Sequence, residues 1–118
     1  MPELEKEVEQ EFKELIRSLG GISYKWVSPG RRGIPDRLVF IRGKVYAVEL
    51  KKIDGKTSPL QRLIHRELAR HEIQVCVVYG KAGVKKLGGY LYVCKQQAAT
   101  NQRDQRFEGK TKTIKVFR

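Results

Sequence analysis

Two acidic residues and one lysine lie at the ends of two adjoining apolar runs. Asp36 opens the run 36–41, and Glu49 and Lys51 close the run 45–51. Both runs are rich in β-branched and aromatic residues, and the short turn between them predicts a β-hairpin. In an antiparallel pair the start of the first strand lies beside the end of the second, and alternate side chains share a face. The sequence therefore predicts that the side chains of Asp36, Glu49 and Lys51 converge.

Two carboxylates and one ammonium group in one place suit the hydrolysis of a phosphodiester. An Mg²⁺ ion held by Asp36 and Glu49 would neutralise the phosphate, lower the pKa of a water molecule and stabilise charge in the transition state. Lys51 would add a positive charge beside the attacking hydroxide or the phosphate. The alternative is structural, with Asp36 as a turn residue and the other two as an exposed charged pair.

Length and charge point to one basic domain. The chain has 118 residues and a formal net charge of +12, and this length suits a single core. The positive charge is concentrated toward the C-terminus, because residues 81–118 hold 10 basic and 2 acidic side chains. Phosphate backbones are the commonest partners of so basic a protein, so we expect a nucleic acid as partner. The alternative is a basic surface that serves only solubility.

Several other classes of protein do not fit this sequence. No stretch reaches the roughly 18 consecutive apolar residues of a membrane span, and the acidic, periodic N-terminus differs from a signal peptide. We therefore expect no membrane association and a cytoplasmic location in a bacterial or phage-infected cell. The segment Gly55-Lys56-Thr57 lacks the upstream glycine of a phosphate-binding P-loop, which argues against nucleotide hydrolysis.

The cysteines and histidines give no sign of a metal or redox site. Cys76 and Cys94 lie in apolar, strand-like surroundings without the spacing of a zinc site or redox pair, so we expect buried free thiols. His65 and His71 fall on or near a predicted helix without a ligand-like partner. We expect both histidines to be structural or surface residues.

The hydrophobic pattern predicts an α/β fold, in which a mixed sheet is flanked by helices. We expect, in chain order, a helix over 3–19, a strand over 22–27, the hairpin, a helix from Ser58 to about His71, a strand over 73–79, a short helix over 81–87 ended by Gly88-Gly89, and a strand over 90–93. Residues 1–94 are expected to form the core, and residues 95–118 a basic C-terminal tail. Within that tail, residues 112–117 are a candidate edge strand.

The motifs around the hairpin resemble a known family of nucleases. Pro35-Asp36 followed by Glu49-Leu50-Lys51 matches the PD-(D/E)xK signature. The segments 33–37, 48–52 and 55–61 look like the virus-type replication-repair nuclease (VRR-NUC) domain, of the small stand-alone kind found in phages and bacteria. The resemblance spans about residues 5–93. It implies a restriction-endonuclease-like fold with an αβββαβ core, dependence on Mg²⁺ or Mn²⁺, and cleavage of branched or flapped DNA.

The resemblance assigns roles to residues of the hairpin and of both helices. Asp36, Glu49 and the backbone carbonyl of Leu50 would bind the metal, and Lys51 would act on the hydroxide and the transition state.

Two further assignments fall on the helices. A glutamate of the first helix usually completes such a site, and Glu5 and Glu9 are both candidates, with the distance to the helix end favouring Glu9. Gln61 matches a glutamine of the family that lies near the metal. It also fits a capping box with Ser58, so both roles stay open for Gln61.

Basic residues near the predicted site, or on the later helix, are candidates for contacts with DNA phosphates. They are Lys25, Arg31, Arg32, Lys52, Lys56, Lys81, Lys85 and Lys86. Stand-alone members of the family resemble Holliday-junction resolvases, so the resemblance implies a homodimer acting on four-way junctions. The alternatives are a flap or nicking nuclease of the same fold, or a nucleic-acid-binding module without catalytic activity.

Overall fold

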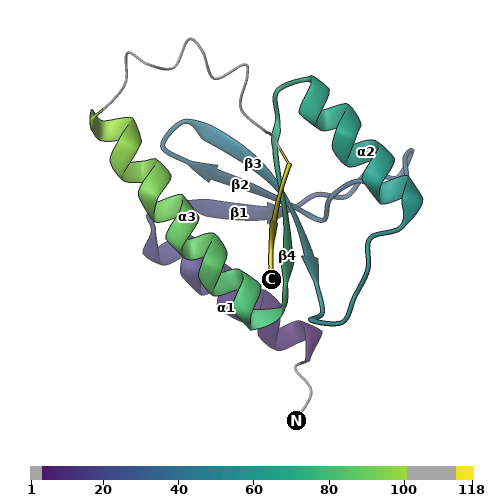
Figure 1. The fold of residues 1–118 in the computed structure, drawn as a ribbon, viewed down its shortest axis with the longest axis horizontal. Helices are drawn as coiled ribbons and strands as arrows, with labels where there is room; N and C mark the ends of the chain where they lie inside the picture. Colours follow the sequence, from purple (N-terminus) through teal and green to yellow (C-terminus); the bar gives the residue numbers. More distant parts are fainter. Residues whose placement is uncertain (1–3, 101–113) are drawn as a thin grey trace.

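The strands lie side by side in the order in which the chain forms them, with helices packed against both faces of the sheet (Figure 1). The structure is a computed structural model that describes residues 4–100 and 114–118. Its elements are α1 (Glu5–Ser18), β1 (Ile22–Lys25), β2 (Arg37–Ile41), β3 (Lys44–Lys51), α2 (Pro59–Arg70), β4 (Gln74–Tyr79), α3 (Gly80–Thr100) and β5 (Ile114–Phe117). The mixed α/β fold predicted from the sequence is confirmed.

Strand β3 is the point where the sheet changes from antiparallel to parallel pairing. β1, β2 and β3 pair antiparallel, whereas β3, β4 and β5 pair parallel. The hairpin of β2 and β3 turns at Arg42 and Gly43, whose φ angles are 49° and 78°. Positive φ at both central residues is what a two-residue type I′ turn needs, so this local sequence fixes the hairpin register. That register pairs Arg37 with Val48.

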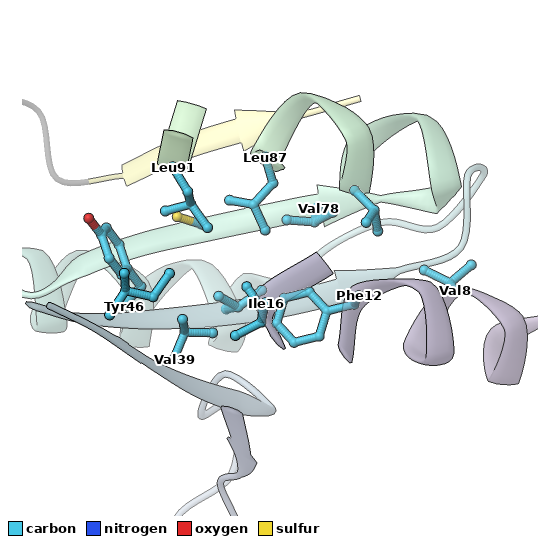
Figure 2. Close-up of a cluster of buried hydrophobic side chains, with 12 residues drawn as sticks. Val8, Phe12, Ile16, Val39, Tyr46, Val78, Leu87 and Leu91 are labelled. Atoms are coloured by element: carbon cyan, nitrogen blue, oxygen red, sulfur yellow. The ribbon is translucent and has the colours of Figure 1, made fainter. Parts of the chain in front are cut away.

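One face of the sheet packs against α1 and α3 and forms the main core (Figure 2). Phe12 and Ile16 of α1 are one turn apart, as are Leu87 and Leu91 of α3, and all four side chains are buried. They meet alternate residues of the strands, because a strand presents every second side chain to the same face. These strand residues are Val39, Ile41, Tyr46, Val48, Cys76 and Val78.

The opposite face of the sheet is covered by α2, which lies apart from α1 and α3 in Figure 1. Its buried residues are Ile64 and His65. The helix starts as the sequence predicts: Ser58 is the N-cap, Pro59 follows, and the Ser58 Oγ accepts a hydrogen bond from the Gln61 amide at 3.1 Å. This cap fixes the first turn of α2 beside the end of β3.

The prediction of a strand over 90–93 is wrong, because α3 continues through Gly88-Gly89 to Thr100. Gly88 does not end the helix. It allows close approach to α1, since a Cβ atom at this position would lie 2.8 Å from Leu15 Cδ1. The spacing of the buried residues Val84, Leu87 and Leu91 is helical throughout.

The last strand comes from the C-terminal residues. β5 pairs parallel with β4, with Val78 opposite Phe117. Gly83 packs against this strand so closely that a Cβ atom there would lie 2.6 Å from the Phe117 carbonyl oxygen. The expected division after residue 94 falls within α3, and residues 101–113 lie outside the described part. The assignment of 95–118 as a separate tail stays a prediction.

Smaller differences from the predictions concern strand ends and thiols. β1 ends at Lys25 rather than at Val27. Both cysteines are free, as predicted, but only Cys76 is fully buried, because Cys94 lies on α3 and is partly exposed. Within the described ranges, none of the helices has the length and apolar content that crossing a bilayer requires.

Candidate active site

Asp36, Glu49, Lys51 and Gln61 meet where β2 begins, β3 ends and α2 begins. We call these four residues the carboxylate site. Asp36 Oδ1 accepts a hydrogen bond from the backbone amide of Leu50 at 3.1 Å. This bond holds Asp36 beside the end of β3, where Glu49 and Lys51 emerge on the face that α2 covers. The hairpin register and the alternation of side chains thus bring together the residues singled out in the sequence.

Gln61 links the acidic and basic members of the carboxylate site. Its Nε2 donates to Glu49 Oε2 at 3.1 Å, and its Oε1 accepts from Lys51 Nζ at 3.0 Å. Lys51 Nζ also lies 3.5 Å from Glu49 Oε2. The three side chains therefore form a closed ring of polar contacts that orients Glu49 and Lys51 toward each other.

Gln61 also completes the capping box of α2. Its side-chain Oε1 accepts a hydrogen bond from the backbone amide of Ser58 at 2.9 Å, while Ser58 Oγ accepts one from the backbone amide of Gln61. The sequence left open a role in capping and a role in the site. The geometry shows that one side chain makes both sets of contacts, because its oxygen serves Ser58 and Lys51 together.

Burial raises the pKa of both carboxyl groups. Glu49 is 6% exposed, and its pKa rises to about 7, first because burial disfavours the charged form and second because Asp36 carries a like charge. Lys51 opposes this rise. Burial likewise raises the pKa of Asp36, against the effect of the Leu50 amide. Like charges close together and poorly hydrated are unfavourable unless a cation joins them.

One oxygen of Glu49 is left for such a cation. Glu49 Oε1 is buried and has no hydrogen-bond partner in the structure, whereas Oε2 contacts Gln61 and Lys51. Among residues 4–100 and 114–118, however, no three His, Cys, Asp or Glu side chains are grouped so that they could hold a metal. A metal here would depend on two carboxylates, a backbone carbonyl and water, which is the kind of site that Mg²⁺ accepts.

The two candidate glutamates of α1 lie near Asp36 but outside the carboxylate site. Glu5 and Glu9 line a pocket together with Asp36, Lys51 and Lys52. Glu9 Oε1 is 3.2 Å from Arg37 Nη2, and its charge also raises the pKa of Asp36. Glu9 therefore lies within electrostatic range of the site, while its carboxylate is engaged by Arg37.

Arg37 is a site residue that sequence reasoning missed. Only 4% of it is exposed, and its Nε has no hydrogen-bond partner. It lies on the core face of β2, where Val39 and Ile41 follow at alternate positions. A cation at the first position of an alternating apolar strand is the signal that could have revealed a buried partner on α1.

His65 was expected to be a structural or a surface residue, and the structure shows that it is buried. It is 2% exposed, and its Nε2 has no hydrogen-bond partner. Burial lowers the pKa of His65, and the charge of Lys51 lowers it further. His71, in contrast, is exposed at the C-cap of α2.

The predicted DNA-contact residues fall into separate groups. Lys52 lines the pocket that contains Asp36, and Lys56 lines a neighbouring cavity. Lys25 and Arg32 are exposed at the end of β1 and in the loop that follows.

The remaining cations are engaged elsewhere or lie on another element. Arg31 Nη2 lies 3.4 Å from Glu67 Oε1, and Lys81 Nζ lies 3.6 Å from Glu7 Oε1. Lys85 and Lys86 are exposed on α3, which packs on the sheet face opposite α2.

Comparisons with known proteins agree with this arrangement. No family model matches the sequence. Over 75 residues the chain is 44% identical to a protein described as "Putative nuclease p44" from Acyrthosiphon pisum secondary endosymbiont phage 1, a match that covers 63% of this chain and 81% of that protein. A solved structure described as a VRR_NUC domain matches with a TM-score of 0.69 and 34% identity, covering 75% of this chain and 97% of the other. Both matches cover most of the relative's length.

Proposed function

Because this chain belongs to the VRR-NUC family, we propose that it is a nuclease, and specifically a metal-dependent endonuclease that hydrolyses phosphodiester bonds in DNA. The observation that carries the proposal is the carboxylate site. Glu49, which is buried, and Asp36, which is partly buried, both have raised pKa values. They lie beside a lysine and a glutamine in a protein of high positive charge. Perturbed acids grouped in this way are typical of active sites.

Divalent metal binding fits the side chains present. The proposed ligands are Asp36, Glu49 through its unpartnered Oε1, and the backbone carbonyl of Leu50. A bound Mg²⁺ or Mn²⁺ would supply positive charge to the phosphate and acidify the attacking water. Glu49 must be deprotonated to bind a metal. Because its pKa is about 7, part of the protein carries a protonated Glu49 at neutral pH, and metal binding must release that proton.

The other residues of the site have roles that follow from their contacts. Lys51, with Nζ 3.5 Å from Glu49 Oε2, would place a positive charge beside the phosphate and stabilise the transition state. Gln61 keeps Lys51 and Glu49 in this relation through its two hydrogen bonds. The carboxylate of Glu9 is engaged by Arg37, and its charge raises the pKa of Asp36. We therefore propose that Glu9 acts on the site through its charge.

Branched DNA, such as a four-way junction, is the proposed substrate, and a homodimer the proposed assembly. Both rest on the family resemblance, and the net charge of +12 supports a polyanionic partner. A symmetric pair of active sites would allow two matched cuts across a junction. DNA as the substrate would place this activity inside a bacterial or phage-infected cell.

A cleavage assay tests the proposed function. A labelled four-way junction and a linear duplex of the same sequence are incubated with the protein in Mg²⁺, in Mn²⁺ and in EDTA. We expect cleavage of the junction only with metal, and at least about 100-fold slower cleavage by the Glu49→Gln variant. Glu14→Gln, which alters an exposed residue on α1, is the matched control. Equal cleavage by Glu49→Gln and the native chain would contradict the proposal.

The same assay separates the enzyme from a DNA-binding module without activity. A junction that is retarded in a native gel but stays intact with both metals would favour the binding module. Cleavage of flapped substrates in preference to junctions would instead identify a flap nuclease with the same site.

A further inference from the structure

A second cavity opens beside the carboxylate site, and the C-terminal strand helps to form it. The cavity has a volume of about 430 Å³, within the range of ligand-binding sites. We call it the Arg118 cavity. The lining residues that matter here are Asp54, Lys56, Thr57, Arg62, Tyr79 and Arg118.

The fold places this cavity next to the proposed catalytic residues. Tyr79 ends β4 and pairs in parallel register with Lys51. Arg62 directly follows Gln61 on α2, and Lys56 lies on the connector that leaves β3. The cavity and the carboxylate site therefore share the carboxyl end of the parallel strands, where ligands bind in α/β sheets.

Arg118 reaches the cavity because β5 extends the sheet. Phe117 pairs with Val78. The residues that follow them, Arg118 and Tyr79, both line the cavity. The guanidinium carbon of Arg118 lies 4.1 Å from the centroid of the Tyr79 ring. A stacked guanidinium keeps its N–H groups directed outward in its own plane, which is the geometry that binds phosphate oxygens in pairs.

The charge of the Arg118 cavity is positive. Lys56, Arg62 and Arg118 face one acidic residue, Asp54. Within the described part of the chain, none of the three cations forms an ion pair. Arg62 is held in place because its Nη1 donates to the Thr57 carbonyl oxygen at 2.7 Å and to Thr57 Oγ1 at 3.3 Å. The cavity thus offers excess positive charge on a partly fixed frame.

We propose that the Arg118 cavity binds a backbone phosphate of the DNA strand close to the phosphate that is cleaved, with Arg118 and Lys56 as the contacting residues. The proposal rests on the function proposed above and names a further part of the substrate-binding surface. Tyr79 is only 4% exposed, so its ring is covered and does not stack on bases. Contacts from a guanidinium and an ammonium group to phosphate oxygens carry no sequence information, so binding here should not depend on base sequence.

A binding measurement without metal tests this proposal apart from catalysis. Fluorescence anisotropy of a labelled four-way junction in EDTA is compared for the native chain and the double variant Arg118→Gln/Lys56→Gln. We expect about tenfold weaker binding at moderate salt and a salt dependence whose slope falls by about one to two. The matched control is Arg42→Gln/Lys44→Gln, which removes the same charges from the hairpin turn at the other end of β3.

Two further variants separate lost contact from lost structure. Arg118→Lys keeps the charge but cannot bind two phosphate oxygens in one plane, so it should recover only part of the affinity that Arg118→Gln loses. Both variants should keep the melting temperature of the native chain. If Arg118→Gln/Lys56→Gln binds the junction like the native chain, with the same salt slope, the proposal is wrong.

A competition experiment identifies the source of the phosphate. Deoxyadenosine monophosphate is titrated into the complex of the protein with the junction. A double variant that loses binding of the mononucleotide but keeps its affinity for DNA would overturn the assignment to DNA. Glu49→Gln distinguishes the two proposals: active Glu49→Gln contradicts the nuclease function, whereas inactive Glu49→Gln alongside native-like binding by the double variant contradicts only the Arg118 cavity.

Discussion

The carboxylate of Asp36 accepts a hydrogen bond from the backbone amide of Leu50 at 3.1 Å. The residue that precedes β2 is thereby fixed to the segment of β3 that carries Glu49 and Lys51. One side chain thus has two separable properties, a hydrogen-bond acceptor that holds the strand ends together and a negative charge beside Glu49.

Substitution of Asp36 separates these two properties. Asp36→Asn keeps an acceptor for the Leu50 amide but removes a charge that burial and Glu49 disfavour, so we expect thermal stability at least equal to that of the native chain and at least about 100-fold slower cleavage. Asp36→Ala removes both properties and should also lose about 1 kcal/mol of stability, because a partly buried amide loses its partner. Melting curves and single-turnover cleavage check both variants. Equal stability of Asp36→Ala and Asp36→Asn would show that the hydrogen bond is unimportant for the fold.

The raised pKa of Glu49 predicts how stability depends on pH without metal. Its pKa is about 7 in the folded chain, against an ordinary value of 4.5, so the folded state binds more protons between these two values. The free energy of unfolding should therefore fall as pH rises from 4.5 to 7, by about 2 to 3 kcal/mol from this group. Urea unfolding in EDTA across this pH range measures the effect.

Glu49→Gln is the matched variant for that measurement. Its free energy of unfolding should exceed that of the native chain above pH 7, and the two should converge near pH 4.5. His65 acts in the opposite direction, because burial lowers its pKa and its contribution to stability is lost as pH falls below about 6.5. Both proteins contain His65, so its effect cancels when the free energy of unfolding of one protein is subtracted from that of the other. A difference that does not change with pH would contradict the raised pKa of Glu49.

The two roles of Gln61 can be measured separately. Ser58→Ala removes only the hydroxyl that accepts from the Gln61 amide, so it should cost about 1 kcal/mol of stability and leave the cleavage rate unchanged. Gln61→Ala also removes the contacts with Lys51 and Glu49, so it should reduce both stability and the cleavage rate. Equal cleavage rates for the two variants would assign Gln61 to capping alone.

The two adjacent glycines of α3 should respond differently to alanine. A Cβ atom at Gly88 would lie 2.8 Å from Leu15 Cδ1, whereas nothing lies within 4 Å of one at Gly89. Gly89→Ala should stabilise the helix by about 0.5 to 1 kcal/mol. Gly88→Ala gains the same helix propensity but must displace Leu15, so its melting temperature should be lower than that of Gly89→Ala. Destabilisation by Gly89→Ala would indicate that the helix ends there.

The parts of the fold that the sequence predicted are those set by local patterns. The turn at Arg42-Gly43 and the alternation along both strands are sufficient to bring Asp36 beside Glu49. The N-cap at Ser58 likewise marks where α2 begins and so where Gln61 lies. These features depend on residues close together in the chain, which is why they are visible without coordinates.

The parts that could not be predicted depend on contacts between distant segments. Gly88-Gly89 looks like a helix end, and only the close approach of Leu15 on α1 explains why a glycine stands at position 88 inside the helix. The pairing of Glu9 with Arg37 and the stacking of Arg118 on Tyr79 both require the packing of separate elements. The register of β5 on β4 is not encoded in either strand alone.

The hairpin of β2 and β3 closes over a two-residue turn, whereas β4, the parallel partner of β3, follows α2 in the chain and is much farther away in sequence. Short closures form faster during folding than distant ones. We therefore expect Asp36 and Glu49 to come together early, before Gln61 and β4 pack around them. A nascent chain is therefore expected to meet the repulsion between its two acids at the start of folding.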